Sequence, residues 1–258
     1  MLEGLTAFVT GASGGIGREI AVVLVDHGAN VTLAARSEEG LRETAARIDD
    51  EDRTLVVTCD VSDEPSVEDA IDACVGEFDG LDILVNNAGI GGPTKPVEEV
   101  SVEEWQGTQD VNVLGTFLTV KHAVSHLRAS DRASVVNIGS IAGKDPYPTR
   151  TPYSASKMAV IGFGRSLAHE LGPDGVTVNT VCPGAVEGDR IERMISNQAE
   201  VRDISYEEAM AKRVTDRLPL DSIVDPADVG ELVAYLASEH ARNLTGQDIN
   251  VDSGAIVD

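Results

Sequence analysis

The 258-residue chain contains few cysteines, few aromatic residues and no long apolar run. Its 3 cysteines include no CxxC pair, which predicts a reduced, cytoplasmic protein without a metal site. No apolar stretch reaches the roughly 18 residues needed to span a membrane, and the N-terminus lacks the basic start of a signal peptide. Aromatic residues make up 3 % of the chain, which argues against a large, flat substrate. We therefore expect neither a membrane protein nor a disulfide-rich secreted domain.

Positive charge is also scarce. Lysine and arginine number 20 against 44 aspartates and glutamates, so the formal net charge is −24. Such a surface repels phosphates, which excludes nucleic acid as a partner. The acidic residues are spread along the chain instead of forming one tail, which favours a surface adapted to high salt and a halophilic source. The alternative interpretation is an ordinary acidic soluble protein.

What the chain does contain is an alternation of short Val/Ile/Leu-rich runs and amphipathic helical stretches. Most runs show no strict alternation of apolar and polar residues, as is typical of strands buried on both faces. This pattern predicts a single α/β domain over residues 1–258, with a doubly wound, Rossmann-like parallel sheet and helices on both faces. The seven predicted strands are 6–10, 30–35, 54–59, 82–87, 133–140, 176–182 and 248–252.

Local signals predict two helix starts and one lid. Ser101, followed three residues later by Glu104, is typical of a capping box that begins a long helix. Asp225 before Pro226 is typical of a second helix start. The stretch 185–217 contains no predicted strand and is rich in charge. Because it follows the sixth strand, we expect it to form a lid over a substrate crevice.

A glycine-rich segment lies between the first predicted strand and the first helix. It has the spacing T-G-x-x-x-G-x-G and consists of Thr10-Gly11-Ala12-Ser13-Gly14-Gly15-Ile16-Gly17. Glycines allow a tight turn and let a pyrophosphate approach the backbone, while the helix N-terminus offers free N–H groups. For this motif alone, a glycine turn without a ligand is the alternative interpretation.

Five more motifs follow in order along the chain. They are Asn86-Asn87-Ala88-Gly89, Asn112, Ser140, Tyr153-Ser154-Ala155-Ser156-Lys157 and Pro183-Gly184. With the glycine turn, they make the sequence resemble the short-chain dehydrogenase/reductase family over essentially its whole length. The resemblance implies an NAD(P)-dependent oxidoreductase that interconverts a secondary alcohol and a ketone by hydride transfer. A non-catalytic dinucleotide-binding regulator, or a lyase or epimerase on the same fold, is the alternative.

Tyr153 and Lys157 are four residues apart and therefore share one helix face. A free phenol titrates near pH ~10, and a nearby ammonium favours the phenolate, which makes Tyr153 a candidate general acid and base. The resemblance implies that Ser140 hydrogen-bonds the reacting oxygen, that Lys157 also holds the nicotinamide ribose and that Asn112 anchors a proton-relaying water. An ordinary surface pair of tyrosine and lysine is the alternative interpretation.

The end of the second predicted strand bears on the cofactor. An acidic residue there would bond the ribose 2′-hydroxyl, but the chain has Ala35-Arg36-Ser37, which favours NADP over NAD. Val186 stands near where many relatives have a threonine, so we expect a contact through its backbone. The residues that the glycine turn and the resemblance together assign to the cofactor are Gly11, Ser13, Gly15, Ile16, Gly17, Arg36, Asp60, Val61, Asn87, Ala88, Gly89, Tyr153, Lys157, Pro183, Gly184 and Val186.

Substrate and assembly are less constrained by the sequence. A 3-oxoacyl thioester and a sugar or sugar acid are both compatible with the motifs. Cations in the predicted lid permit an anionic substrate, although a solvated helix is the alternative; they are Arg190, Arg193 and Arg202. We expect three residues before Tyr153 to border the pocket, namely Lys144, Tyr147 and Arg150. The resemblance also implies a homotetramer, with helices near 101–128 and 152–171 and the C-terminal segment at its interfaces.

Overall fold

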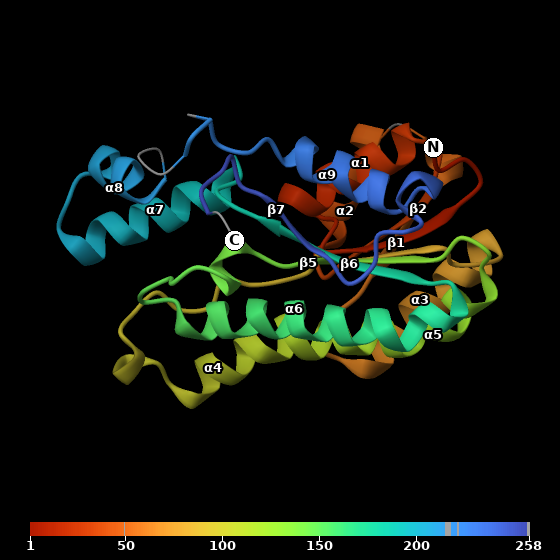
Figure 1. The fold of residues 1–258 in the computed structure, drawn as a ribbon, viewed down its shortest axis with the longest axis horizontal. Helices are drawn as coiled ribbons and strands as arrows, with labels where there is room; N and C mark the ends of the chain where they lie inside the picture. Colours follow the sequence, from red (N-terminus) through yellow and green to blue (C-terminus); the bar gives the residue numbers. More distant parts are fainter. Residues whose placement is uncertain (49, 215–217, 221, 257–258) are drawn as a thin grey trace.

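The computed structural model describes residues 1–48, 50–214, 218–220 and 222–256. Its centre is a seven-stranded sheet in the order β3-β2-β1-β4-β5-β6-β7, in which all neighbours are parallel (Figure 1). This confirms the predicted doubly wound fold and all seven predicted strands. Their bounds are β1 (Thr6–Thr10), β2 (Asn30–Ala35), β3 (Thr54–Thr58), β4 (Ile83–Asn86), β5 (Ser134–Ile138), β6 (Thr177–Pro183) and β7 (Asp248–Val251).

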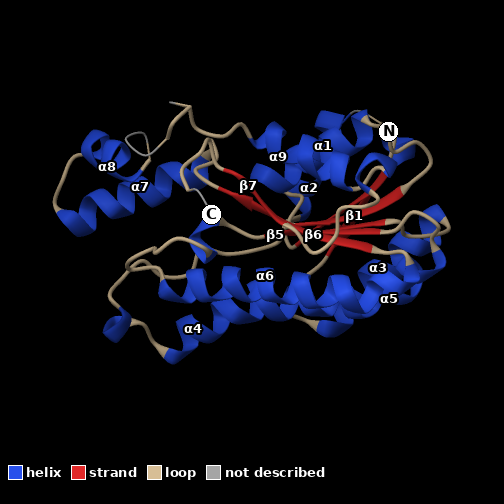
Figure 2. Ribbon diagram, in the orientation of Figure 1, coloured by secondary structure: helices blue, strands red, loops and turns tan. Residues whose placement is uncertain are grey.

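Helices cover both faces of the sheet (Figure 2). One face carries α1 (Gly15–Asp26), α2 (Glu38–Ile48) and α9 (Pro226–Leu236). The other carries α3 (Glu64–Phe78), α5 (Gly115–Ala129) and α6 (Thr151–Leu171), and α4 (Val102–Gln109) leads into α5. In the described part of the chain, no helix is long and apolar enough to cross a membrane.

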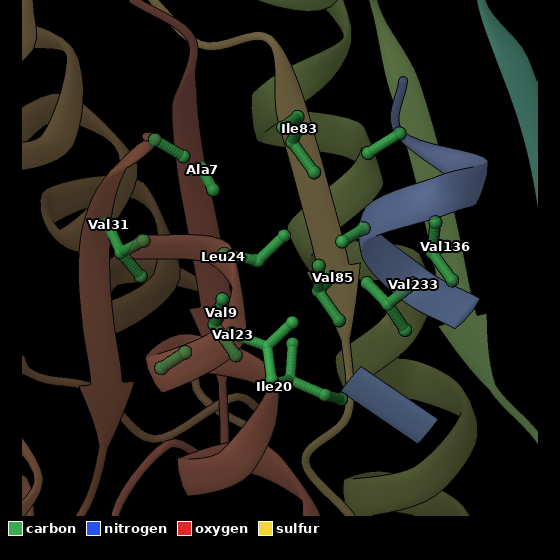
Figure 3. Packing of buried hydrophobic residues seen from close by; sticks show 14 of the residues in the cluster. Ala7, Val9, Ile20, Val23, Leu24, Val31, Ile83, Val85, Val136 and Val233 are labelled. Carbon is green, nitrogen blue, oxygen red and sulfur yellow. The ribbon is translucent and has the colours of Figure 1, made fainter. Parts of the chain in front are cut away.

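Alternating side chains of β1 supply both layers of the core. Ala7 and Val9 pack in one cluster with side chains of α1 and α9, and Figure 3 shows Ile20 near Val9 and Val233 between Val85 and Val136. Phe8 points to the opposite face and packs with α3, α5 and α6. Since every residue of β1 is buried, an apolar run without strict alternation is what this position requires. Truncating the fully buried Phe8 to alanine should cost about 3–5 kcal/mol.

The two predicted helix starts are present. Ser101 Oγ accepts a hydrogen bond from Glu104 N at 3.2 Å, and Glu104 Oε2 accepts one from Ser101 N at 2.9 Å. Asp225 Oδ1 accepts from Ala227 N at 2.9 Å. The long helix after Ser101 differs from the prediction in one respect, since a π-helical segment, Asp110–Leu114, separates α4 from α5. Such a segment inserts an extra residue into one turn and is frequent at functional sites.

The predicted lid region forms two helices, α7 (Asp189–Arg202) and α8 (Tyr206–Arg213), which project at one end of the molecule (Figure 1). They have a small apolar core of their own, formed by Ile191, Ile195, Ala199, Ala209, Val214 and Leu218. The only strand-like feature among the described lid residues is a parallel bridge between Val186 and Val224. Residues 215–217 of the predicted lid lie outside the described residues.

Candidate active site

A cleft lies at the carboxyl ends of the strands, where the strand order reverses between β1 and β4. Its volume is about 1060 Å³, which is large enough for a dinucleotide and a small substrate. It brings together every residue predicted to contact the cofactor and three of the four predicted catalytic residues. These lining residues are Gly11, Ser13, Gly15, Ile16, Gly17, Arg36, Asp60, Val61, Asn87, Ala88, Gly89, Ser140, Tyr153, Lys157, Pro183, Gly184 and Val186.

The glycine turn forms one wall of the cleft. Gly11 and Gly15 have φ angles of 68° and 54°, which L side chains rarely adopt. A Cβ on Gly14 or Gly15 would meet nothing within 4 Å, so the backbone there borders open space. α1 begins at Gly15 without a side-chain cap, which leaves its first backbone N–H groups for an anionic ligand. The turn therefore fits the pyrophosphate of a dinucleotide.

Asn87 ties the glycine turn to the end of β4. Its Nδ2 atom donates to Thr10 O at 2.8 Å and to Gly11 O at 3.3 Å. Thr10 Oγ1 in turn accepts from the backbone N–H groups of Asn87 and Ala88, at 2.9 and 3.0 Å. A Cβ on Gly17 would lie 2.3 Å from Asn87 Nδ2, so only glycine leaves room for this contact. Thr10 and Asn87 thus fix the glycine turn after β1 against the loop after β4.

Tyr153 and Lys157 lie on the first turns of α6 and are almost fully buried, with exposures of 8 % and 4 %. Lys157 Nζ lies 5.9 Å from the centroid of the Tyr153 ring and donates to Ile138 O at 2.7 Å. A Cβ on Gly89 would lie 3.5 Å from the same ammonium. The ammonium therefore sits between the tyrosine, the end of β5 and the loop after β4.

Ser140 starts a 3-10 turn, Ile141–Gly143, directly after β5. Its Oγ accepts from Ala142 N at 3.1 Å, so the hydroxyl proton remains to be donated to a group in the cleft. The turn touches α6, because a Cβ on Gly143 would lie 2.8 Å from Met158 N. This contact brings Ser140 to the side of the cleft that Tyr153 occupies.

Asn112 lies in the π-helical segment and is 1 % exposed. Its Oδ1 accepts from Ile90 N at 2.8 Å, and its Nδ2 donates to Ile90 O at 3.0 Å and to Ser156 Oγ at 2.9 Å. A Cβ on Gly89 would lie 3.2 Å from Asn112 Oδ1 and 3.5 Å from Lys157 Nζ, so both side chains approach Gly89 on the side where another residue would carry its Cβ. The side chain clamps the loop after β4 to α6 from behind the cleft.

Two arginines, Arg18 and Arg36, line the cleft together with the glycine turn. Arg36 follows β2 and is exposed. The pKa of the Asp60 carboxyl lies below its ordinary value, mainly because it accepts hydrogen bonds from Ser62, with a smaller contribution from the charge of Arg36. Arg18, which the sequence analysis missed, donates to Ser13 O at 2.8 Å and to Glu43 Oε2 at 2.8 Å. No sequence signal marked Arg18, since its contacts link segments far apart in the chain.

The expected pocket residues before Tyr153 divide into two groups. Tyr147 and Arg150 line the cleft, as does Arg193 of the lid. Lys144 does not, so that expectation was wrong. Its ammonium instead forms an ion pair with Asp248 Oδ2 at 2.8 Å on β7, because a buried lysine needs an anionic partner. Arg202 is exposed outside the cleft, and the side chain of Arg190 lies outside the described part.

Metal-ligand clusters and reactive thiols were sought among the described residues. They contain no cluster of three or more His, Cys, Asp or Glu side chains that could hold a metal ion. Burial raises the pKa of Cys59, Cys74 and Cys182 to about 11, so all three are protonated thiols at neutral pH. A protonated, buried thiol is not a nucleophile.

Known proteins share this architecture. A family model described as enoyl-(acyl carrier protein) reductase matches residues 11–255. The 3-oxoacyl-(acyl-carrier-protein) reductase of Vibrio cholerae is 33 % identical over 253 residues, which cover 98 % of each of the two chains. Actinorhodin polyketide ketoreductase, solved with NADPH, has a TM-score of 0.92, 37 % identity and 99 % coverage of both chains. The 3-ketoacyl-(acyl-carrier-protein) reductase of Brucella melitensis, solved with NADH, has a TM-score of 0.89, 30 % identity and 100 % coverage of both chains.

The doubly wound sheet and the cleft at its switch point define a dinucleotide-binding protein of the Rossmann class. The family match and these relatives show that the chain belongs to the short-chain dehydrogenase/reductase family. It is an NAD(P)-dependent oxidoreductase that acts on a ketone or the corresponding alcohol.

Proposed function

We propose that the protein reduces a 3-oxoacyl thioester to the 3-hydroxyacyl thioester, with Tyr153 as the proton donor. The observation that carries this proposal is the convergence of Tyr153, Lys157 and Ser140 on one cleft that the glycine turn also borders. When bound, the nicotinamide supplies the hydride that reduces the ketone carbon. Tyr153 gives its phenolic proton to the carbonyl oxygen, so the ketone gains one hydride and one proton and becomes a secondary alcohol.

Ser140 donates its hydroxyl proton as a hydrogen bond to the same carbonyl oxygen and stabilises the charge that develops there. Lys157 places a positive charge beside the Tyr153 ring and stabilises the phenolate left after proton transfer. Asn112 holds the loop that adjoins Lys157, where a water in contact with the ammonium can return the proton to Tyr153. Each of these side chains is buried, so its position is set by packing before the substrate arrives.

The cofactor is held by the glycine turn, the loop after β4 and the segment after β6. In the bridge between Val186 and Val224, the backbone bonds run through Ala185 O and Glu187 N. The N–H and C=O of Val186 therefore lie on the opposite edge of the segment, which favours a backbone contact to the carboxamide. Lys157 lines the cleft beside Gly89, which supports the proposal that its ammonium holds the nicotinamide ribose.

We propose NADP as the preferred cofactor. The guanidinium of Arg18 is bonded to protein carbonyls and Glu43, whereas Arg36 is exposed at the cleft and suits a 2′-phosphate. No acidic residue occupies the end of β2, where a carboxylate would repel that phosphate.

The substrate class rests on similarity to ketoacyl reductases, which favours a 3-oxoacyl thioester over a sugar or sugar acid. The region 185–217 is proposed as a lid, and Arg193 brings a cation to the cleft on its side. The experiment is a panel of 3-oxoacyl thioesters, small ketones and sugar acids with each cofactor, followed by the absorbance of reduced nicotinamide. Turnover of thioesters alone supports the proposal, whereas binding of cofactor without any turnover would favour a dinucleotide-binding regulator. Consumption of substrate without a net change in cofactor would favour a lyase or epimerase.

We also propose a homotetramer. Large apolar side chains on α4, α5 and α6 and the segments joining them are between 39 % and 77 % exposed, which is costly for a free surface. They are Val102, Trp105, Leu114, Phe117 and Met158. Light scattering at working salt tests this proposal, and a monomer would refute it.

The three buried thiols support a reducing, cytoplasmic location.

A further inference from the structure

Arg150 is a buried cation beside Tyr153. It is 7 % exposed and lies one residue before α6, three residues before the tyrosine. Its Cζ atom is 5.2 Å from the centroid of the Tyr153 ring and 5.6 Å from that of the Tyr147 ring. A guanidinium at such a distance over an aromatic face is attracted by the ring quadrupole, and the attraction grows when water is excluded.

The guanidinium also reaches the loop after β4. Arg150 Nη2 donates to Gly91 O at 2.8 Å, and Nη1 donates to Thr94 Oγ1 at 3.4 Å. The backbone strengthens this link, since Lys95 N donates to Thr149 O at 3.0 Å. Arg150 therefore connects the tyrosine to the same loop that Asn112 holds at Ile90, so the loop is fixed at two points.

The backbone just before Arg150 is strained. Thr149 has a φ of 67°, a left-handed conformation that a β-branched residue rarely adopts. Its Oγ1 accepts from Gln198 Nε2 of α7 at 3.3 Å. Strain of this kind persists only where surrounding contacts hold it, and it is concentrated at functional sites. Here the strained residue directly precedes Arg150, whose guanidinium lies beside the ring of Tyr153, the candidate proton donor.

We propose that Arg150 is a positioning residue for Tyr153, whose guanidinium holds the phenol ring against residues 90–94 and keeps a positive charge over the ring. The proposal rests on the assignment of Tyr153 as the proton donor. It adds a second cation to the site, independent of Lys157, and supplies it from the segment before α6. Nη1 and Nη2 of Arg150 donate to the loop after β4, so the guanidinium is anchored while it lies beside the Tyr153 ring. We therefore assign Arg150 to the tyrosine and not to the substrate.

The charge has a measurable consequence for the phenol. The titratable and charged groups lining the cleft around Tyr153 are Asp145, Tyr147, Arg150, Lys157, Glu187 and Arg193. Of these, Arg150 and Lys157 have charges 5.2 and 5.9 Å from the ring centroid. Removing one charge at this distance should raise the pH at which Tyr153 ionises by roughly 0.5–2 units, as Coulomb's law gives for effective dielectric constants of about 80 to 20.

The experiment compares Arg150→Met with Arg150→Lys, and uses Arg165→Met as the control. Arg165 lies further along α6, is exposed and pairs with Asp248 outside the cleft. Tyrosinate absorbance is titrated in cofactor-free protein, and the contribution of Tyr153 is obtained by subtracting the same background carrying Tyr153→Phe. The pH profile of kcat/KM for alcohol oxidation is recorded in parallel.

Arg150→Met should ionise Tyr153 at a pH higher by roughly 0.5–2 units, while Arg165→Met leaves it unchanged. Arg150→Lys keeps the charge but loses the planar fork, so ionisation should stay near that of the parent while kcat/KM falls by at least about threefold. An unchanged titration in Arg150→Met would overturn the proposal. If that variant does not fold, Arg150→Lys decides, because a parent-like kcat/KM there would overturn it too. Full turnover in Tyr153→Phe would refute the proposed function and with it the positioning role, whereas an unchanged titration in Arg150→Met would overturn the positioning role and leave the proposed function intact.

Discussion

The Lys157 ammonium nitrogen lies 5.9 Å from the centroid of the Tyr153 ring, one helical turn further along α6. The same nitrogen donates to Ile138 O, so the lysine is fixed by the sheet and not by the helix alone. A charge held in this way does not need to reorganise when the phenol loses its proton. This relationship is the basis of the first prediction.

Tyr153→Phe keeps the ring and removes the transferable proton. Turnover should fall by at least about 10²-fold, because general acid catalysis typically contributes about 10²–10⁴. Cofactor affinity should change little, which fluorescence titration with the reduced cofactor would measure. Tyr147→Phe is the matched control and should keep most of the activity. Near-parent turnover in the Tyr153 variant would rule out this tyrosine as the proton donor.

Gly17→Ala should damage the glycine turn. The added Cβ would lie 2.3 Å from Asn87 Nδ2 and 2.3 Å from Gly11 O, so the turn and the loop after β4 must separate. We expect a loss of about 1–3 kcal/mol in the free energy of unfolding, measured without cofactor, as for other overpacked sites. Gly14→Ala is the control, since its Cβ would meet nothing within 4 Å. Equal stability of the two variants would contradict the packing argument.

Arg36→Ala should weaken NADP(H) binding more than NAD(H) binding. A charge-assisted hydrogen bond is worth roughly 1.5–3 kcal/mol, or about a 10- to 150-fold change in Kd. Calorimetric titration of both cofactors measures the difference. Arg42→Ala is the control, because Arg42 is exposed and paired with Glu38 on α2. The same loss for both cofactors would mean that Arg36 does not contact the 2′-phosphate.

Asp248→Asn should reduce stability in a pH-dependent way. Burial raises the pKa of this carboxyl, but hydrogen bonds and charges from Lys144 and Arg165 outweigh it and hold the pKa below its usual range. A carboxyl whose pKa is lower in the folded than in the unfolded state stabilises the fold fully at pH values above its unfolded pKa of about 4. This stabilisation is lost as the pH falls through the folded pKa. We expect a deficit of roughly 1.5–3 kcal/mol at pH 7 by urea unfolding. The deficit should begin to shrink as the pH falls below about 4, and a deficit that is the same at pH ~3 as at pH 7 would be inconsistent with this assignment.

Salt should stabilise the protein. A net charge of −24 creates self-repulsion, whose range falls from roughly 10 Å at 0.1 M salt to 3 Å at 1 M. Because net stability is only about 5–15 kcal/mol, the summed repulsion matters. We expect the Tm and the activity to rise from about 0.1 M to above 1 M KCl as screening increases. A Tm insensitive to salt over this range would indicate that the acidic surface serves another purpose, such as docking a basic partner.

Features that depend on neighbouring residues were predictable from the sequence. The seven strands follow from apolar runs, and the capping box of Ser101 and Glu104 follows from their spacing. The shared helix face of Tyr153 and Lys157 follows from the period of the α-helix. In each case the interaction links residues at most a few positions apart, so the local pattern contains the information.

Other features were decided only by the tertiary structure. Three such features depend on contacts between residues far apart in the chain. They are the position of Asn112 in the π-helical segment, the hydrogen bonds of Arg18 to Ser13 and Glu43, and the different partners of Lys144 and Arg150. Lys144 and Arg150 are both cations before α6, yet one pairs with Asp248 on β7 and the other with the loop after β4. A linear pattern does not specify which partner is near. The parallel sheet does, because its crossovers bring the carboxyl ends of distant strands to one edge, where a buried charge must find the partner that the fold provides.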